Sequence, residues 1–121
     1  MKKVVGLGAC VLDTLINCAE YPREDTKLKA ESIFLSGGGP VGNALVVMSK
    51  LGVKTEVIGG FGGDTAGKYL LEDFTRYGVG VENATVCTDA TSFTSYIVRA
   101  EDKATRTCMF DRGTGADDPS N

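Results

Sequence analysis

Apolar and polar positions change their spacing several times along this chain of 121 residues. Residues 2–10 are small and β-branched, which predicts a buried strand. Further extended segments are predicted over residues 28–35 and 54–59. After the glycine run at 37–39 the apolar spacing becomes helical, and Gly52 predicts the end of this helix. Its predicted apolar face consists of Val41, Ala44, Leu45, Met48 and Leu51, while Val46 and Val47 predict cover on more than one side.

A second helix is predicted after Asp64, whose short carboxylate side chain suits the N-cap position. Its apolar stripe contains Leu70, Leu71, Phe74 and Tyr77, and Gly78 predicts its end. The order strand, helix, strand, helix, strand is typical of an α/β domain with a parallel sheet and right-handed crossovers.

The last third of the chain is richer in Thr, Tyr, Ile, Val and Phe. Residues 92–100 and 104–110 predict a hairpin. Two strands alone are marginally stable in water, so we expect them to join residues 14–18 and 28–35 in a small second sheet. Near the end, Asp118 or Ser120 suits a helix N-cap, yet no helix follows. This pattern predicts a chain that stops where the next element should begin.

Composition narrows the classes of function. Apolar residues make up 42% and charged residues 24%, as in ordinary globular domains. The net charge of -3 and the absence of a basic cluster argue against a nucleic-acid partner. No apolar run approaches the roughly 20 residues that cross a bilayer, and no secretion signal is visible, so we expect a cytoplasmic protein without a membrane partner.

The content of histidine and cysteine excludes some chemistry. The chain has no His, which excludes a Ser-His-Asp triad and His-ligated zinc. The cysteines form no C-x-x-C pair, which excludes a zinc ribbon and a thioredoxin motif. Disulfides are the alternative that the sequence leaves open, but without an export signal we expect reduced, buried thiols. They are Cys10, Cys18, Cys87 and Cys108.

The segment from Ser36 to Asn43 contains three consecutive glycines that lead into the first predicted helix. Unshielded backbone N–H groups at a helix N-terminus can bind hydroxyls or anions. A tight structural turn explains the same glycines. Asp13 is predicted at the carboxyl end of the first strand, where ligands collect in α/β sheets and a carboxylate can accept two hydroxyl protons. As a lone residue it also suits a turn or a cap, and for Asp64 capping is the better interpretation.

Two nucleotide motifs are weak or absent. Gly6 and Gly8 match the first two glycines of a dinucleotide fingerprint, but Val11 occupies the third position, where helix and strand must pack closely. A nicotinamide-dependent oxidoreductase is therefore disfavoured. No G-x-x-x-x-G-K-[ST] phosphate loop occurs.

Taken together, these segments resemble the N-terminal part of the ribokinase-like, or PfkB-type, carbohydrate kinases over essentially the whole chain. The resemblance lies in residues 8–13, in Gly38-Gly39 with Asn43, in Gly52 and in the Gly62-Gly63-Asp64-x-x-Gly67 segment. It implies a partial ribokinase-like α/β fold over residues 1–121, namely a parallel sheet with flanking helices and a small β-sheet lid. The implied lid strands lie near residues 14–18, 28–35, 92–100 and 104–110, and they often build a homodimer.

The resemblance also implies a substrate site. Its implied residues are Asp13, Gly38, Gly39 and Asn43, which would bind substrate hydroxyls, and Arg112, whose guanidinium would pair with a carboxylate or phosphate on the sugar. Ribokinases proper carry Asn and Lys where this chain has Val11 and Pro40, and the family usually has small residues at Val41 and Leu45. These departures leave a hexose, a ketose or a sugar acid at least as well supported as ribose.

By the same resemblance, the complete enzyme uses ATP and Mg²⁺ to phosphorylate a sugar hydroxyl. The family takes its base and nucleotide site from a G-A-G-D-type motif in its C-terminal half, and nothing after Gly113 matches it. We therefore assign no catalytic, cofactor or metal residue here, and we expect the chain alone to bind no nucleotide and to be inactive. A nucleoside kinase fragment and a non-catalytic binding or dimerisation module of the same fold remain alternatives.

Overall fold

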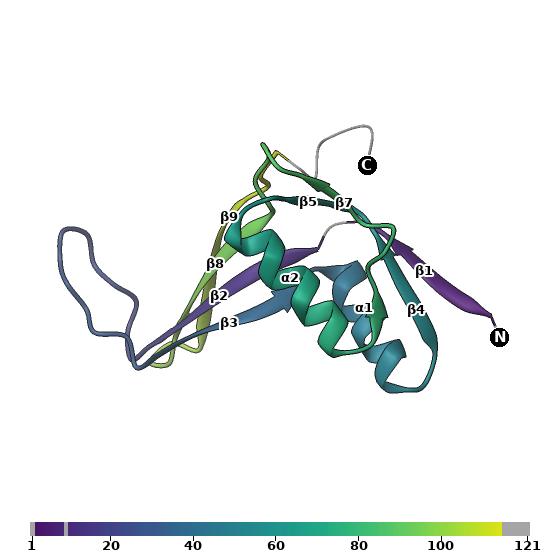
Figure 1. The fold of residues 1–121 in the computed structure, drawn as a ribbon. Helices are drawn as coiled ribbons and strands as arrows, with labels where there is room; N and C mark the ends of the chain where they lie inside the picture. Colours follow the sequence, from purple (N-terminus) through teal and green to yellow (C-terminus); the bar gives the residue numbers. More distant parts are fainter. Residues whose placement is uncertain (1, 9, 115–121) are drawn as a thin grey trace.

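The computed structural model describes residues 2–8 and 10–114 and has the predicted α/β class (Figure 1). A parallel sheet is formed in the order β1-β4-β6 by β1 (Lys3–Leu7), β4 (Lys54–Ile58) and β6 (Val79–Gly80). Helix α1 (Pro40–Lys50) packs on β1 and β4. Helix α2 (Thr65–Arg76) packs on β6 and on two strands outside this sheet, β2 (Val11–Cys18) and β5 (Gly60–Gly62). A short parallel pair, β5 (Gly60–Gly62) and β7 (Thr85–Cys87), lies beside α2.

The hydrophobic core lies between this sheet and the two helices. Its most completely buried side chains each expose less than 2% of their surface; they are Leu45, Val57, Phe61 and Leu70. Phe74 meets Phe61 edge to face, with 6.4 Å between the ring centroids. The start of the next sheet reaches this core through Leu12, so the two parts of the molecule share one packed centre.

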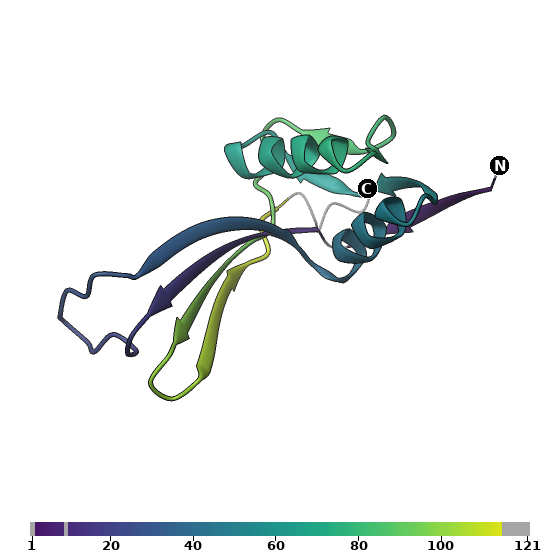
Figure 2. The ribbon, with the colours of Figure 1, turned by 90° about the horizontal axis from the view of Figure 1, so that it is seen from below.

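A second sheet of four strands projects away from the helices, as both views show (Figures 1 and 2). It has the order β3-β2-β8-β9 and consists of β2 (Val11–Cys18), β3 (Ser32–Gly38), β8 (Thr94–Ala100) and β9 (Thr105–Asp111). β2 runs parallel to β8, and the other two pairs are antiparallel. The predicted hairpin is therefore present as β8 and β9, and it joins two early segments in one sheet: β8 pairs with β2, and β3 lies on the other side of β2.

The prediction of one strand over residues 2–10 is wrong. β1 ends at Leu7, and Val11 already belongs to the other sheet. Gly8 has φ +150°, and a Cβ on it would lie 2.7 Å from Cγ2 of Val41 on α1. Only glycine combines this backbone angle with so close a helix, and the chain leaves the first sheet at this point.

The extended segment predicted at residues 28–35 is also displaced. β3 spans Ser32–Gly38, so Gly37 and Gly38 are strand residues paired with Leu12 and Val11 rather than loop residues. Asp13, which was predicted at the carboxyl end of the first strand, lies inside β2 of the second sheet. The glycine run was predicted as a loop because its pairing with β2 is not visible in the local sequence.

Both helix ends follow their predicted signals, but some predicted faces do not. Gly52 and Gly78 have φ values of +89° and +80° just after the helices. On α1, however, Leu51 is 77% exposed and caps the helix, and Val47 is 56% exposed, so the expected cover on this side is not present. Ala44 is exposed too, and Tyr77 caps α2 instead of completing its buried stripe.

The thiols were predicted to be buried, and this is right for Cys10 and Cys18 but wrong for Cys108. Cys108 lies on the edge strand β9, which is exposed along its whole length. The predicted N-cap at Asp118 or Ser120 lies outside the described residues. Among the described residues, no helix combines the length and hydropathy that spanning a bilayer requires.

Candidate substrate-binding site

Asp13 occupies the middle of the four-stranded sheet, on the central strand β2. Its direct neighbours across the sheet are Ser36 on β3 and Ser95 on β8. The Ser95 hydroxyl donates a hydrogen bond to Oδ1 of Asp13. The carboxylate is partly exposed, whereas Ser95 is only 4% exposed. A charged oxygen acceptor is therefore held at a fixed place on an otherwise largely apolar strand.

Gly38 lies directly against this carboxylate. A Cβ at Gly38 would stand 2.2 Å from Oδ2 of Asp13, so any side chain there would displace the carboxylate. Neighbouring residues of a strand face opposite sides of the sheet. Accordingly, a Cβ at Gly37 would meet a different carboxylate, Oδ2 of Asp73 on α2, at 2.8 Å. Each glycine thus leaves room for an acidic side chain, and a Cβ at either position would make that carboxylate move.

Gly39 connects β3 to α1 and takes the N-cap position with φ +88°. It provides no side-chain cap, and Pro40 at the first helical position has no N–H. The N–H groups of the first turn have no intrahelical partner and carry the positive end of the helix dipole. Asn43 is the next residue: it is exposed, and its N–H already donates to the Gly39 carbonyl at 3.0 Å. The donors of this turn are therefore the N–H groups of Val41 and Gly42, which follow soon after the Gly38 that meets Asp13, and the Asn43 side-chain amide.

Arg112 stands apart from these four residues. It follows β9, and β8 lies between β9 and the strand that carries Asp13. Two strand spacings correspond to about 10 Å. The structure thus places Gly38 against Asp13, Gly39 next to it at the start of α1 and Asn43 one turn into that helix, whereas Arg112 follows β9, two strands away from β2.

Three further residues that were not predicted from the sequence lie on the face of the sheet that carries Asp13. Ser95 is one, and the others are Phe93 and Phe110, whose rings lie 5.8 Å apart between centroids. The register places Phe110 opposite Ser95, which lies opposite Asp13. Alternation along the predicted hairpin would have shown that Phe93, Ser95 and Phe110 share a face, but not that Asp13 shares it.

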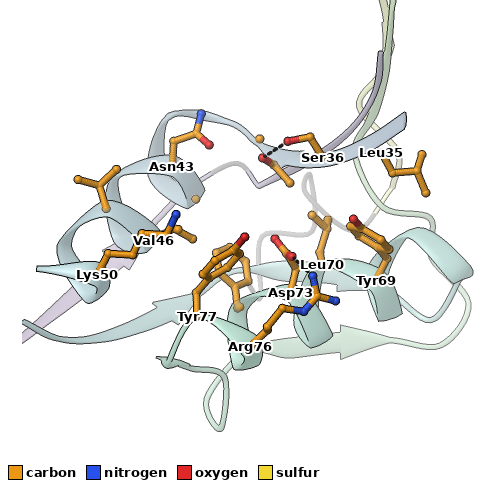
Figure 3. Close-up of a pocket in the computed structure, with 15 residues that line it drawn as sticks. Leu35, Ser36, Asn43, Val46, Lys50, Tyr69, Leu70, Asp73, Arg76 and Tyr77 are labelled. Carbon is orange, nitrogen blue, oxygen red and sulfur yellow. Dashed lines mark hydrogen bonds and ion pairs between the residues drawn. The ribbon is translucent and has the colours of Figure 1, made fainter. Parts of the chain in front are cut away.

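A cavity of about 480 Å³ lies between α1, α2 and the end of β3 (Figure 3). Gly38 and Asn43 line it, but Asp13 does not, and Asp73 places it on the Gly37 side of the strand. Its charged groups are already engaged: Asp73 pairs with Arg76 at 3.1 Å, and the Lys50 ammonium lies 4.7 Å from the centre of the Tyr77 ring. The cavity therefore contains two of the predicted site residues, Gly38 and Asn43, but not Asp13.

The Gly62–Gly67 segment is structural. Asp64 caps α2, as predicted, by accepting the Gly67 N–H at 2.9 Å, and it also accepts the Ser92 N–H and hydroxyl. Burial would raise the pKa of the Asp64 carboxyl, but the hydrogen bonds from Ser92 and Gly67 outweigh burial and hold its pKa below the ordinary value. A Cβ at Gly67 would lie 2.1 Å from the Gly62 carbonyl oxygen. This motif therefore joins α2 to the start of β8.

Over residues 2–8 and 10–114, no three Cys, Asp or Glu side chains come together in a group that could hold a metal ion. Mg²⁺ is commonly held by one or two carboxylates together with substrate phosphates, so this finding concerns only sites built from protein side chains alone.

The arrangement of these elements matches a known class of fold. A candidate ribokinase of Agrobacterium tumefaciens superposes with a TM-score of 0.85 at 25% identity, covering 97% of this chain and 38% of that protein. The class defined by the fold is thus the ribokinase-like kinases. The model of the pfkB family carbohydrate kinases matches residues 1–119, and the chain belongs to this family.

Two relatives illustrate the range of substrates in the family. The nucleoside kinase of Methanothermobacter thermautotrophicus is 24% identical over 101 residues, covering 84% of this chain and 33% of that protein. The ketohexokinase of Mus musculus is 31% identical over 84 residues, covering 69% of this chain and 28% of that protein. The chain thus spans about a third of the length of the curated relatives it matches.

Proposed function

We propose that this chain is the substrate-binding part of an ATP-dependent kinase that transfers a phosphoryl group to a sugar hydroxyl. The observation that carries the proposal is the Asp13 carboxylate, with one oxygen bonded to Ser95 and the other against Gly38, beside the N-terminus of α1. A carboxylate accepts hydrogen bonds from sugar hydroxyls, and exposed N–H groups donate to sugar oxygens.

In this proposal each site residue has a limited role. Asp13 accepts hydroxyl protons, Gly38 and Gly39 let the substrate approach the backbone, and Asn43 contributes an amide that donates and accepts. Arg112 enters only for substrates long enough to reach the far edge of the sheet, such as sugar acids or sugar phosphates. The base, the nucleotide site and Mg²⁺ belong to the complete enzyme, so we expect residues 1–121 alone to bind no nucleotide and to be inactive.

We also propose that the four-stranded sheet is a lid over the substrate and a homodimer surface. Its face opposite Asp13 carries one cross-strand row in which three large apolar side chains are 47–61% exposed, namely Leu35, Tyr96 and Met109. Burying such a patch stabilises association at roughly 25 cal/mol per Å² of apolar surface. A Met109→Lys variant should sediment as a monomer, while Phe110→Lys on the other face should remain dimeric.

A nucleoside substrate is the second candidate, and the ring pair Phe93–Phe110 favours it. These rings lie on the face of Asp13, and Phe110 is 64% exposed. An exposed aromatic ring can stack on a nucleobase as well as on the apolar face of a sugar. If adenosine is bound in preference to free sugars, this candidate replaces the first.

The proposal is tested by incubating the full-length protein with ATP, Mg²⁺ and, in turn, D-ribose, D-fructose, D-glucose, D-gluconate and adenosine. We expect one of them to stimulate ADP release. Asn43→Ala should then raise its KM, whereas Asn17→Ala, which removes an amide paired only with Ser32 in the described residues, should not. ADP release that no acceptor stimulates would contradict the proposal.

A further inference from the structure

Ser95 is a buried hydroxyl on a strand whose other buried residues are apolar. It is 4% exposed on the central strand β8, where Ile97, Val98 and Ala100 are also buried. Burying a hydroxyl costs free energy unless it finds a partner, and a hydrogen bond to a charged acceptor is the strongest partner available. Ser95 has such a partner in Asp13, 82 residues away in the sequence.

Asp13 depends on this one donor. Among the described residues, Ser95 is the only side chain or backbone group that the structure shows donating a hydrogen bond to the carboxylate. Ser36, its neighbour on the other side, instead donates to the Gly37 carbonyl at 3.3 Å. Gly38 lies against Oδ2. The carboxylate is therefore held between a hydroxyl on one strand and a bare Cα on another.

We infer that Ser95 is a positioning residue for substrate recognition: it fixes the orientation of the Asp13 carboxylate so that the remaining lone pairs face the substrate. The inference rests on the proposed function of Asp13. Without the Ser95 hydroxyl, the Asp13 carboxylate could turn about its Cβ–Cγ bond. Only some of the orientations that the carboxylate then adopts would accept hydrogen bonds from the substrate. Restraining a binding group before the substrate arrives lowers the entropy lost on binding.

The geometry makes a specific prediction about how the two residues combine. If Ser95 acts through Asp13, its removal should weaken binding only while Asp13 is present. If Ser95 merely supports the sheet, its removal should weaken binding by the same factor in either background. Ser36 is the matched control, since it is a serine in the same cross-strand row that makes no hydrogen bond to Asp13 in the described structure.

The experiment is a double-mutant cycle in the full-length protein, read as the Kd of the best-bound member of the panel named above. We expect Ser95→Ala to raise Kd about tenfold, Ser95→Thr to restore most of the affinity, and Ser36→Ala to change little. In an Asp13→Ala background, Ser95→Ala should have no further effect. Thermal unfolding of each variant identifies any loss of fold, and the Thr variant tests the inference if the Ala variant does not fold.

Each other outcome has a defined meaning. If Asp13→Ala leaves Kd unchanged, the proposed function of the site is wrong. If Asp13→Ala weakens binding but Ser95→Ala does not, or weakens it equally in both backgrounds, only the positioning role is overturned. Failure of Ser95→Thr to recover affinity, in a variant that unfolds at the wild-type temperature, also counts against the inference.

Discussion

The parallel sheet with its two helices and the four-stranded sheet bury their apolar residues differently. In the first region, side chains from helices and strands meet in one core where Leu45 and Val57 expose 1% or less of their surface. In the second, only the central strands are substantially buried, while the outer strands expose Ile33 at 63% and Phe110 at 64%. We therefore expect the first region to carry most of the stability, and we propose the second as the surface for ligands and partners.

Truncating the core should have the largest effect on stability. Leu45→Ala removes a fully buried side chain packed between α1 and the parallel sheet, and we expect a loss of about 2–5 kcal/mol in the free energy of unfolding. Ile33→Ala on β3 should cost less than about 0.5 kcal/mol. Urea denaturation of both variants measures the contrast, and equal losses would contradict the division between the two regions.

A methyl group at Gly38 should disturb binding more than stability. Gly38→Ala places Cβ against Oδ2 of Asp13 and moves the carboxylate, so we expect substrate binding to weaken by about 1–3 kcal/mol. Gly80→Ala on β6 is the matched control, because its Cβ would meet its nearest neighbour at an ordinary 3.4 Å. Unchanged affinity in Gly38→Ala would show that the site lies elsewhere.

The hydrogen bonds of Asp64 link the two regions. Their loss should lower the free energy of unfolding by about 1 kcal/mol, as measured by urea denaturation. Asp64→Ala removes the cap of α2 and the hydrogen bonds to Ser92, which leads into β8. Asp102→Ala, in the exposed hairpin turn, should have no such effect.

Asp64 should also give stability a dependence on acid pH. Because its pKa is lower in the folded protein than its ordinary value of 3.8, the contribution is complete above that value and is lost as the pH falls through the folded pKa. Asp64→Asn should reduce this acid-dependent loss. Identical acid unfolding profiles for the wild type and Asp64→Asn would contradict the assignment.

The thiols of Cys10 and Cys108 should differ in reactivity, which is the smallest of the expected effects. Burial raises the pKa of Cys10 to about 11, so few molecules carry the reactive thiolate at neutral pH, whereas Cys108 is exposed on β9. We expect a thiol reagent at pH 7.5 to modify Cys108 first and Cys10 only after unfolding. Peptide mass mapping checks the order, and modification of Cys10 in the folded protein at the rate of Cys108 would contradict the packing around it.

The sequence was sufficient for the features that depend on local signals. The cap at Asp64, the helix ends at Gly52 and Gly78 and the hairpin near residues 101–104 are all set by neighbouring residues. The break between β1 and β2 was missed, because the apolar run is nearly continuous and only the positive φ of Gly8 divides it.

The site was predictable only in part. The segment from Gly38 to Asn43 was found from its glycines, and Asp13 from its place after the first strand. Ser95 was not found, because its contact with Asp13 depends on a parallel pairing between strands 82 residues apart. Arg112 was grouped with the others by resemblance alone, and it follows β9, two strands away from the strand that carries Asp13. Contacts that arise from non-local strand pairing leave no signal in local spacing.

The central claim is that Asp13 binds a substrate hydroxyl, and calorimetric titration of the full-length protein tests it most directly. The best-bound member of the panel would be titrated into the wild type, Asp13→Ala and Asp102→Ala. We predict that Asp13→Ala weakens binding by about 1–3 kcal/mol while Asp102→Ala matches the wild type. Equal affinity in all three would contradict the account, since the carboxylate between Ser95 and Gly38 would then have no part in recognition.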